Sequence, residues 1–406
     1  MEPWQSHGML GGRSPRVAHD DGKEKMNFEL TDTQKILQQT VREFAAAELA
    51  PGAIERDETK TWPAEAVKLL GQMGILGIMT PQEWGGAGMD TVSYAIAVEE
   101  IAKADASTAV VVSVNNSLVC GLLDKFGSQA QKEQYLEPLA TGVKLGAFSL
   151  SEPHAGSDAS NLKCRARRDG DLYRITGIKN WVSNGKHSDV VMLMAVTDPD
   201  AGHSGISCFI VDKGLDGFTV GKLEDKLGIR ASDTTELYFD EVPVPVANRV
   251  GAEGDGFKIA MTVLDGGRIG IAAQAVGIAQ AALDRSVQYA AQRQQFGKPI
   301  GDFQAIQFKL ADMATDTQAA RLLNWHAACL KDAGKIYGPA AAMAKLKASE
   351  TAMAAATQCV QIHGGYGYMR ETGVERLMRD AKITQIYEGT SEVQRVVIAR
   401  SLMQKG

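Results

Sequence analysis

The chain has few cysteines, and none of them forms a recognisable pair. Its 406 residues contain only Cys120, Cys164, Cys208, Cys329 and Cys359. An odd number of widely spaced cysteines without a C-x-x-C pair is not typical of a disulfide framework or a zinc site. We therefore expect reduced, mostly buried thiols in a reducing compartment, and we predict no metal site.

The chain also lacks an excess of positive charge and a long hydrophobic run. Its formal net charge is −6 and its pI is about 5.7, which argues against a surface that neutralises nucleic-acid phosphates. The longest apolar stretch, residues 106–123, contains serine, threonine and asparagine, which is typical of a buried helix rather than a membrane span. We expect no nucleic-acid partner and no membrane insertion.

A third absence is the glycine-rich fingerprint of nucleotide-binding α/β folds. The candidates that begin at Gly86 and Gly365 have Thr91 and Arg370 where G-x-G-x-x-G requires its last glycine. The chain therefore lacks the tight strand-to-helix turn on which such folds hold a pyrophosphate. If the protein binds a dinucleotide, it must do so in another way.

The first 25 residues differ from the rest of the chain. They have no apolar segment of the kind found in a secretory signal, and the helical pattern begins only near Phe28. We expect residues 1–25 to be a disordered leader or a tag, which leaves Met26 as a candidate natural start. A transit peptide is a weaker alternative, because acidic residues are present.

The remaining sequence divides into a helical, a strand-rich and a second helical part. Residues 26–146 are helical in pattern. Residues 147–255 contain short β-rich runs separated by Asp-Gly and proline-containing turns, which indicate a small β-barrel or sandwich. Residues 256–406 return to apolar spacings of three and four and indicate a four-helix bundle, in which we interpret the alanine-rich segment 340–360 only as a close-packed helix. The predicted fold is mainly α with a central β-domain.

Residues 387–392, with the sequence Y-E-G-T-S-E, are the most informative stretch. They place the carboxylate of Glu388 on a short glycine-containing turn between two helix-like segments, where it can point into a cavity. A glutamate in a loop is usually solvated, so this turn alone is weak evidence. It gains weight from two distant stretches, residues 148–158 (F-S-L-S-E-P-H-A-G-S-D) and residues 179–184 (K-N-W-V-S-N).

Together the three stretches resemble the acyl-CoA dehydrogenase family, most closely its short-chain (butyryl-CoA) members, from about residue 26 to the C-terminus. The resemblance implies an FAD-dependent conversion of a short-chain acyl-CoA to a trans-2-enoyl-CoA. Glu388 would take the α-proton, with its pKa raised by desolvation, and flavin N5 would take the β-hydride. The backbone N–H of Glu388 and a ribityl hydroxyl of the flavin would meet the charge that develops on the thioester oxygen.

The same resemblance implies the other site residues, with FAD held in an extended pose between the β-domain and the helical bundle. The implied FAD contacts in the β-domain are Phe148, Leu150, Ser151, Ser157, Trp181, Val182 and Ser183. Those in the bundle are Arg293, Gln295, Phe296, Gln304, Gln361, Ile362, His363, Gly364, Gly365, Thr390, Ser391 and Glu392, of which the arginine and the phenylalanine would reach a neighbouring subunit's FAD. The implied acyl-CoA contacts are Ser157, Asp265, Arg268, Tyr387 and Gly389.

Several of these residues also have a purely structural interpretation. Trp181 could be a core aromatic of the β-domain, and Arg293 could be a cation favoured by a helix C-terminus. Asp265 and Arg268 are spaced as a surface ion pair. His154 stands where the family usually has glycine or alanine, and we interpret it as a solvent-facing loop residue.

Two absences favour an uncharged acyl chain. Isovaleryl-type members carry the base just before the arginine that matches Arg268, and this position is Gly267 here. Glutaryl-type members carry an arginine where this chain has Ala109. Residues 113–118 match the short-chain members, so we predict a preference for four to six carbons.

Three other functions remain as alternatives. They are a medium-chain or 2-methyl-branched acyl-CoA dehydrogenase, an acyl-CoA oxidase, and a flavoprotein with a nucleic-acid-associated role. Acyl-CoA oxidase chains are usually longer than this one. The implied partners are an electron-transferring flavoprotein and further copies of the chain in a homotetramer, a dimer of dimers. We expect a bacterial cytoplasmic location, with the mitochondrial matrix as the alternative.

Overall fold

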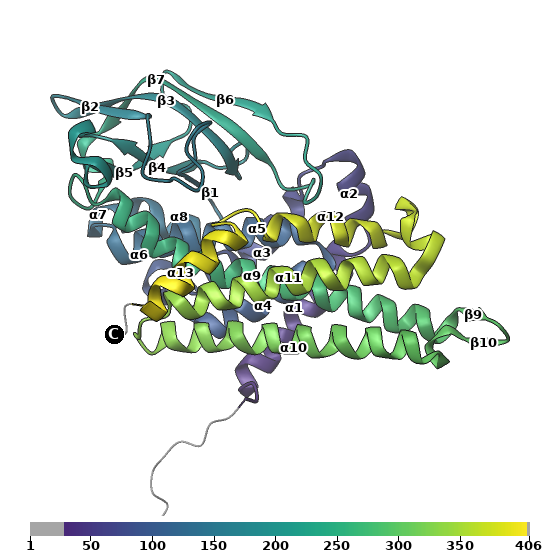
Figure 1. Ribbon diagram of the computed structural model, residues 1–406. Helices are drawn as coiled ribbons and strands as arrows, with labels where there is room; N and C mark the ends of the chain where they lie inside the picture. Colours follow the sequence, from purple (N-terminus) through teal and green to yellow (C-terminus); the bar gives the residue numbers. More distant parts are fainter. Residues whose placement is uncertain (1–27, 404–406) are drawn as a thin grey trace, which may run out of the picture.

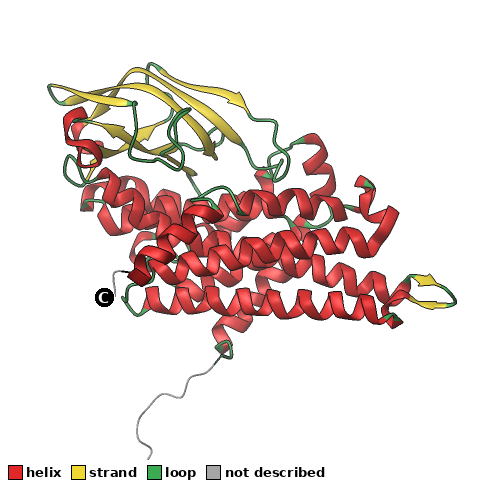
Figure 2. Cartoon of the chain, in the orientation of Figure 1, coloured by secondary structure: helices red, strands yellow, loops and turns green. Residues whose placement is uncertain are grey.

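The computed structural model describes residues 28–403, so the predicted leader of residues 1–25 lies outside the described residues. Strands form one side of the molecule, and helices from both ends of the chain form the other (Figures 1 and 2). The predicted order of helices, then strands, then helices is confirmed.

The N-terminal helices begin at a capping box, in which Thr31 Oγ1 accepts from the Gln34 backbone N–H at 3.2 Å and Gln34 Oε1 accepts from the Thr31 N–H at 3.0 Å. These reciprocal bonds satisfy donors that the first helical turn leaves free. The helices of this part are α1 (Asp32–Phe44), α2 (Ala53–Thr59), α3 (Ala64–Gln72), α4 (Thr91–Ala104), α5 (Ala106–Ser113), α6 (Gly121–Phe126), α7 (Gln129–Gln131) and α8 (Glu137–Ala140), with π-helical turns at Ala45–Leu49, Val114–Cys120 and Lys132–Leu136.

The apolar stretch recognised in the sequence is a core helix. Ala106–Phe126 is the one described helix that could cross a membrane by length and composition, and 94% of its apolar window is buried inside the fold. Its two asparagines are also buried. Asn115 donates to the carbonyls of Leu76 and Leu139 at 2.9 and 3.0 Å and accepts from the Gly146 N–H at 3.0 Å. This amide therefore ties the helical part to the first strand of the sheet.

The β-domain is one mixed sheet with the strand order β6-β7-β3-β2-β4-β5-β8, and β1 pairs with β4. The end strands β6 and β8 do not pair with each other among residues 28–403, so the barrel-or-sandwich prediction resolves to a sheet without closure. Its strands are β1 (Gly146–Ser149), β2 (Arg165–Asp169), β3 (Leu172–Ser183), β4 (Val190–Val196), β5 (Ile206–Asp212), β6 (Phe218–Leu223), β7 (Thr234–Pro245) and β8 (Arg249–Val250).

Alternating side chains give the sheet two apolar faces. Val191 and Leu193 of β4 join Phe209 of β5 in a core inside the β-domain. Their neighbours Val190 and Met192 belong instead to the core shared with the helices. A strand buried on both faces reads as a continuous hydrophobic run, as residues 190–195 do.

The C-terminal helices form the long layer beneath the sheet (Figure 1). Close packing of α4 against the longest of them depends on glycine, because a Cβ at Gly277 would lie 2.4 Å from the Glu99 carbonyl oxygen. The short hairpin β9–β10 projects from one end of this layer. The elements are α9 (Gly256–Gln292), β9 (Gln294–Gln295), β10 (Lys298–Pro299), α10 (Gln304–Asp332), α11 (Gly338–His363), α12 (Val374–Thr384) and α13 (Ser391–Met403).

Candidate active site

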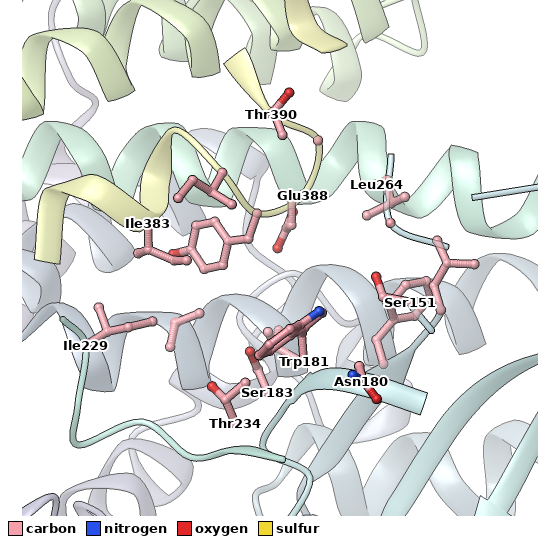
Figure 3. Close-up of a pocket in the computed structure, with 18 of the residues that line it drawn as sticks. Ser151, Asn180, Trp181, Ser183, Ile229, Thr234, Leu264, Ile383, Glu388 and Thr390 are labelled. Atoms are coloured by element: carbon pink, nitrogen blue, oxygen red, sulfur yellow. The ribbon is translucent and has the colours of Figure 1, made fainter. Parts of the chain in front are cut away.

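A cavity of about 610 Å³ lies between the β-domain, helix α9 and the turn that joins α12 to α13. Glu388 points from this turn into the cavity, with Trp181 and Ser183 of β3 on the opposite side (Figure 3). The structure thus brings together residues from all three motif stretches. The predicted site residues that line the cavity are Phe148, Leu150, Ser151, Ser157, Trp181, Ser183, Arg268, Tyr387, Glu388, Gly389 and Thr390.

The turn that carries Glu388 has an unusual backbone. Glu388 has φ of 51° and Gly389 has φ of 89°, so two successive residues are left-handed. For a residue with a side chain, this conformation costs about 1–2 kcal/mol. The Ser391 N–H closes the turn by donating to the Gln385 carbonyl at 2.9 Å. The surrounding contacts therefore hold Glu388 in a conformation that directs its side chain away from either helix.

Glu388 is half-buried, and its carboxylate has no neutralising contact. Its Oε2 atom has no hydrogen-bond partner among the described residues. Burial raises the pKa of Glu388 to about 7, although the charges of Lys345 and Arg268 act in the opposite direction. A carboxylate with a pKa near neutrality is well matched to the task of a general base.

A buried ion pair aligns the two β-domain stretches of the site. Lys179 Nζ donates to Glu152 Oε1 at 2.8 Å and to the Leu150 carbonyl at 2.9 Å, and both charged side chains are almost fully buried. The Asn180 N–H donates to the Ser151 carbonyl at 2.9 Å. These bonds hold the cavity-lining residues of segments 148–158 and 179–184 side by side.

A register shift in β3 directs the aromatic residue. Pairing with β7 is interrupted between Lys179 and Val182, and Trp181 there has φ of 61°. A bulge of this kind changes the direction in which the side chains of a strand point. Trp181 lines the cavity and remains 61% exposed, whereas Val182 lies in the core of the β-domain and not in the cavity.

Three further predicted contacts of this region have partners within the chain. Asp265 and Arg268 form an ion pair on α9, and Arg268 is buried at the cavity wall. The Tyr387 hydroxyl donates to Gln274 of α9. His154, which we interpret from the sequence as a solvent-facing loop residue and not as a contact, is partly exposed, and its Nε2 lies 3.4 Å from Glu152 Oε2.

A second set of predicted residues lies away from the cavity. Arg293 caps α9, and the hairpin after it presents Phe296 with 92% of its surface exposed. The Arg293 guanidinium lies over the ring of Tyr366, 5.7 Å from its centroid, which places the hairpin beside the end of α11. The predicted residues that do not line the cavity are Val182, Asp265, Arg293, Gln295, Phe296, Gln304, Gln361, Ile362, His363, Gly364, Gly365, Ser391 and Glu392.

The chain matches three models of one family over most of its length. They are the acyl-CoA dehydrogenase N-terminal domain (residues 31–143), middle domain (residues 147–242) and C-terminal domain (residues 254–403). A short-chain specific acyl-CoA dehydrogenase of Clostridium acetobutylicum is 50% identical over 374 residues, which are 92% of this chain and 99% of the relative. The chain belongs to the acyl-CoA dehydrogenase family.

Solved structures of the family agree with this assignment. The structure of butyryl-CoA dehydrogenase from Megasphaera elsdenii matches with a TM-score of 0.92 and 49% identity over 93% of this chain and all of that chain. A chain in the structure of an electron transferring flavoprotein of Acidaminococcus fermentans matches with a TM-score of 0.92 and 50% identity, over 93% of this chain and 99% of that chain. The FAD complex of PigA, at 30% identity, has a TM-score of 0.90 over 94% of this chain and all of that chain.

Acyl-CoA dehydrogenases are FAD-dependent oxidoreductases, and the cavity of this chain fits such a cofactor. Its volume is that of a cofactor or substrate site, and its lining is largely apolar. Asn180 Oδ1 and Arg268 Nε are buried at its wall without a partner among the described residues. A bound polar ligand would satisfy such atoms.

The sequence motifs did not reveal two polar residues behind the Glu388 turn. Lys345 of α11 and Gln394 of α13 donate to backbone carbonyls of this turn. Lys345 could have been noticed as a lone charge on the apolar face of an alanine-rich helix, where a lysine is seldom buried.

Proposed function

We propose that the chain is a short-chain acyl-CoA dehydrogenase whose base is Glu388 and whose preferred substrates are butyryl-CoA and hexanoyl-CoA. The observation that supports it best is the Glu388 carboxylate, which points into an apolar cavity with its buried Oε2 atom unpaired among the described residues. The names of the similar short-chain and butyryl-CoA enzymes support the same choice of substrate.

Proton removal is the step for which the chain supplies the reacting group. The α-hydrogen of an acyl thioester is weakly acidic, so a base beside it must be ionised and poorly solvated. A pKa of about 7 allows Glu388 to be largely ionised at slightly alkaline pH while it still has enough basicity to accept the proton. Bound FAD would supply the acceptor for the hydride that leaves the β-carbon, and the product is a trans-2-enoyl thioester.

Stabilisation of the developing charge would come from the same turn. The N–H of Glu388 has no backbone or side-chain acceptor among residues 28–403. A free backbone N–H beside the base can donate to the thioester oxygen as charge moves onto it. Arg268, buried at the cavity wall, adds a positive charge to this environment.

The preference for a short, uncharged acyl chain follows from the helix that closes the cavity. Val110, Val114 and Leu118 line it at intervals of four residues, so one helix face is apolar. Asn115 and Asn116 of the same segment are bonded to backbone groups and do not line the cavity. A terminal carboxylate would meet no cation along this face, which disfavours a dicarboxylic substrate.

An acyl-CoA series from C4 to C12 with the purified holoprotein tests the proposal. We expect kcat/KM to be highest at C4 or C6, because each methylene that fits gains up to about 0.8 kcal/mol and the first that does not fit reverses the trend. A maximum at C12, or strong activity with glutaryl-CoA, would contradict the short-chain assignment. Comparable turnover with oxygen alone and with an artificial acceptor would instead favour an oxidase.

The proposed electron acceptor is an electron-transferring flavoprotein. The similar chain in the Acidaminococcus fermentans structure supports this choice. Anaerobic reduction of a purified electron-transferring flavoprotein by butyryl-CoA and this enzyme, followed by its flavin absorbance, tests it. No reduction of that partner, while an artificial acceptor is reduced, would rule it out.

A further inference from the structure

Lys345 is a charged residue in an otherwise small and apolar part of helix α11. Its side chain is fully buried, and its neighbours Ala341, Ala344 and Ala348 are buried as well. Burial of a lysine is costly unless its ammonium group has partners. The position of those partners therefore indicates what the residue does.

The partners of Lys345 flank the proposed base. Its Nζ donates to the Tyr387 carbonyl at 2.8 Å and to the Gly389 carbonyl. From α13, Gln394 Nε2 donates to the carbonyls of Glu388 at 3.3 Å and Gly389 at 2.9 Å. Each carbonyl of residues 387–389 therefore accepts at least one hydrogen bond from the side chain of Lys345 on α11 or of Gln394 on α13.

We propose that Lys345 is a positioning residue that holds the 387–389 turn so that the Glu388 carboxylate stays directed into the cavity. The inference rests on the proposed role of Glu388 as the base. Without these donors, the partly buried carbonyls would lose their side-chain partners, and the turn would relax from its left-handed conformation. Lys345 does not contact the cavity itself, so it acts through the turn.

The positive charge of Lys345 also lowers the pKa of Glu388. The titratable groups around Glu388 are Lys345 from α11, Arg268 from α9, Tyr94 from α4 and Tyr387 of the same turn. The charge of Glu392 on α13 raises the pKa of Lys345. Burial lowers the pKa of Lys345 to about 8, and the charge of Glu388 acts in the opposite direction. Lys345 is thus mainly protonated at pH 7, where its charge favours the ionised form of Glu388.

The test compares Lys345→Met with Lys347→Met. Lys347 lies on the same helix, but it is partly exposed and pairs with Asp316 at 2.6 Å. We expect Lys345→Met to lower the rate of flavin reduction by butyryl-CoA at least ~10-fold, because small displacements of a catalytic group are expensive. Its KM and FAD content should change by less than about twofold, since the lysine lies outside the cavity. Lys347→Met should behave like the unmodified protein.

The pH dependence separates positioning from a general loss of stability. Removing a positive charge raises the pKa of Glu388, so the acid limb of kcat/KM should move to higher pH in Lys345→Met and not in Lys347→Met. Lys345→Gln keeps a donor without the charge and should show the same pH shift with a smaller loss of rate. It also serves as the test if Lys345→Met does not fold with FAD.

Two negative results have different meanings. Rates and acid limbs in both Lys345 variants equal to those of Lys347→Met would overturn the role of Lys345. A parent enzyme that keeps its activity after Glu388→Gln would instead overturn the proposed base, whatever the Lys345 variants do.

Discussion

The carboxylate of Glu388 occupies the space above the backbone of Gly267. A Cβ built at Gly267 would lie 2.1 Å from Glu388 Oε2, which is closer than any real contact of this kind. A side chain at position 267 and the carboxylate of Glu388 therefore cannot both occupy this site. Gly267 on α9 therefore leaves the space that a carboxylate on the α12–α13 turn needs.

Gly267→Ala should therefore displace the carboxylate and lower kcat/KM for butyryl-CoA by about 10²-fold, since misplacement of a catalytic group by ~1 Å costs that much. Gly266→Ala is the matched control, because a Cβ there would approach only the Tyr337 hydroxyl, at 3.8 Å. Steady-state kinetics on both variants provide the measurement. Equal activity of the two variants would show that the carboxylate can move aside without loss.

Glu388→Gln should keep FAD bound and lose at least ~10²-fold in turnover, because the amide has the shape of the carboxylate but cannot accept the proton. Glu371→Gln, at an exposed position, is the control. The measurement is anaerobic reduction of the flavin by butyryl-CoA in a stopped-flow instrument. Near-normal reduction in Glu388→Gln would remove Glu388 from the mechanism.

The raised pKa of Glu388 also predicts a pH-dependent effect on stability. Between the ordinary glutamate pKa of 4.5 and the folded pKa of about 7, the unfolded chain releases a proton that the folded chain keeps. The contribution of Glu388 to stability therefore falls as pH rises through this window and is constant above it, a loss of up to about 3 kcal/mol. Glu388→Gln should be more stable than the parent at pH 8 and equal to it near pH 4.5. Chemical unfolding at both pH values, with excess FAD, tests this, and a variant that is less stable at pH 8 would contradict it.

The sequence allowed some of these relationships to be predicted and not others. The turn at Glu388 was recognisable because its residues are contiguous. The contact between Gly267 and Glu388 was not, because it joins residues more than a hundred positions apart. Residues 113–118 drew attention to a short-chain cavity, but Asn115 ties the scaffold together through backbone bonds, and only its apolar neighbours reach the cavity.

The missed lysine has a similar explanation. Alanine-rich helices with lysines usually expose the lysine, so segment 340–360 indicated packing alone. The burial of Lys345 depends on where α12 and α13 cross α11, which is a tertiary relationship. Whether the sheet closes was likewise not predictable, because closure depends on pairing between the end strands β6 and β8, which is a non-local relationship.

Loss of one partner of the buried Glu152–Lys179 pair should destabilise the site. Lys179→Met removes the lysine charge and leaves the buried Glu152 carboxylate with backbone N–H donors from Lys163 and Cys164 and with His154 at 3.4 Å, and we expect a loss of about 3–5 kcal/mol in unfolding free energy. The variant should also release FAD more readily, because the pair aligns two cavity-lining stretches. Arg174→Met, which removes a partly exposed pair with Asp169, should cost at most about 1 kcal/mol. Equal losses in the two variants, measured by denaturant unfolding, would refute a special role for the buried pair.

The exposed hairpin predicts that assembly and flavin retention are linked. Phe296 is too exposed to be explained by packing within one chain, and Arg293 beside it lies outside the chain's own cavity. If, as we propose, these residues complete the FAD site of a neighbouring copy in a homotetramer, Arg293→Ala should weaken both FAD binding and assembly, because a ligand stabilises the state that binds it. Arg167→Ala, which removes an exposed arginine from β2, should change neither. Sedimentation velocity combined with the ratio of flavin to protein absorbance measures both properties, and a monomer with a full complement of FAD would contradict the proposal.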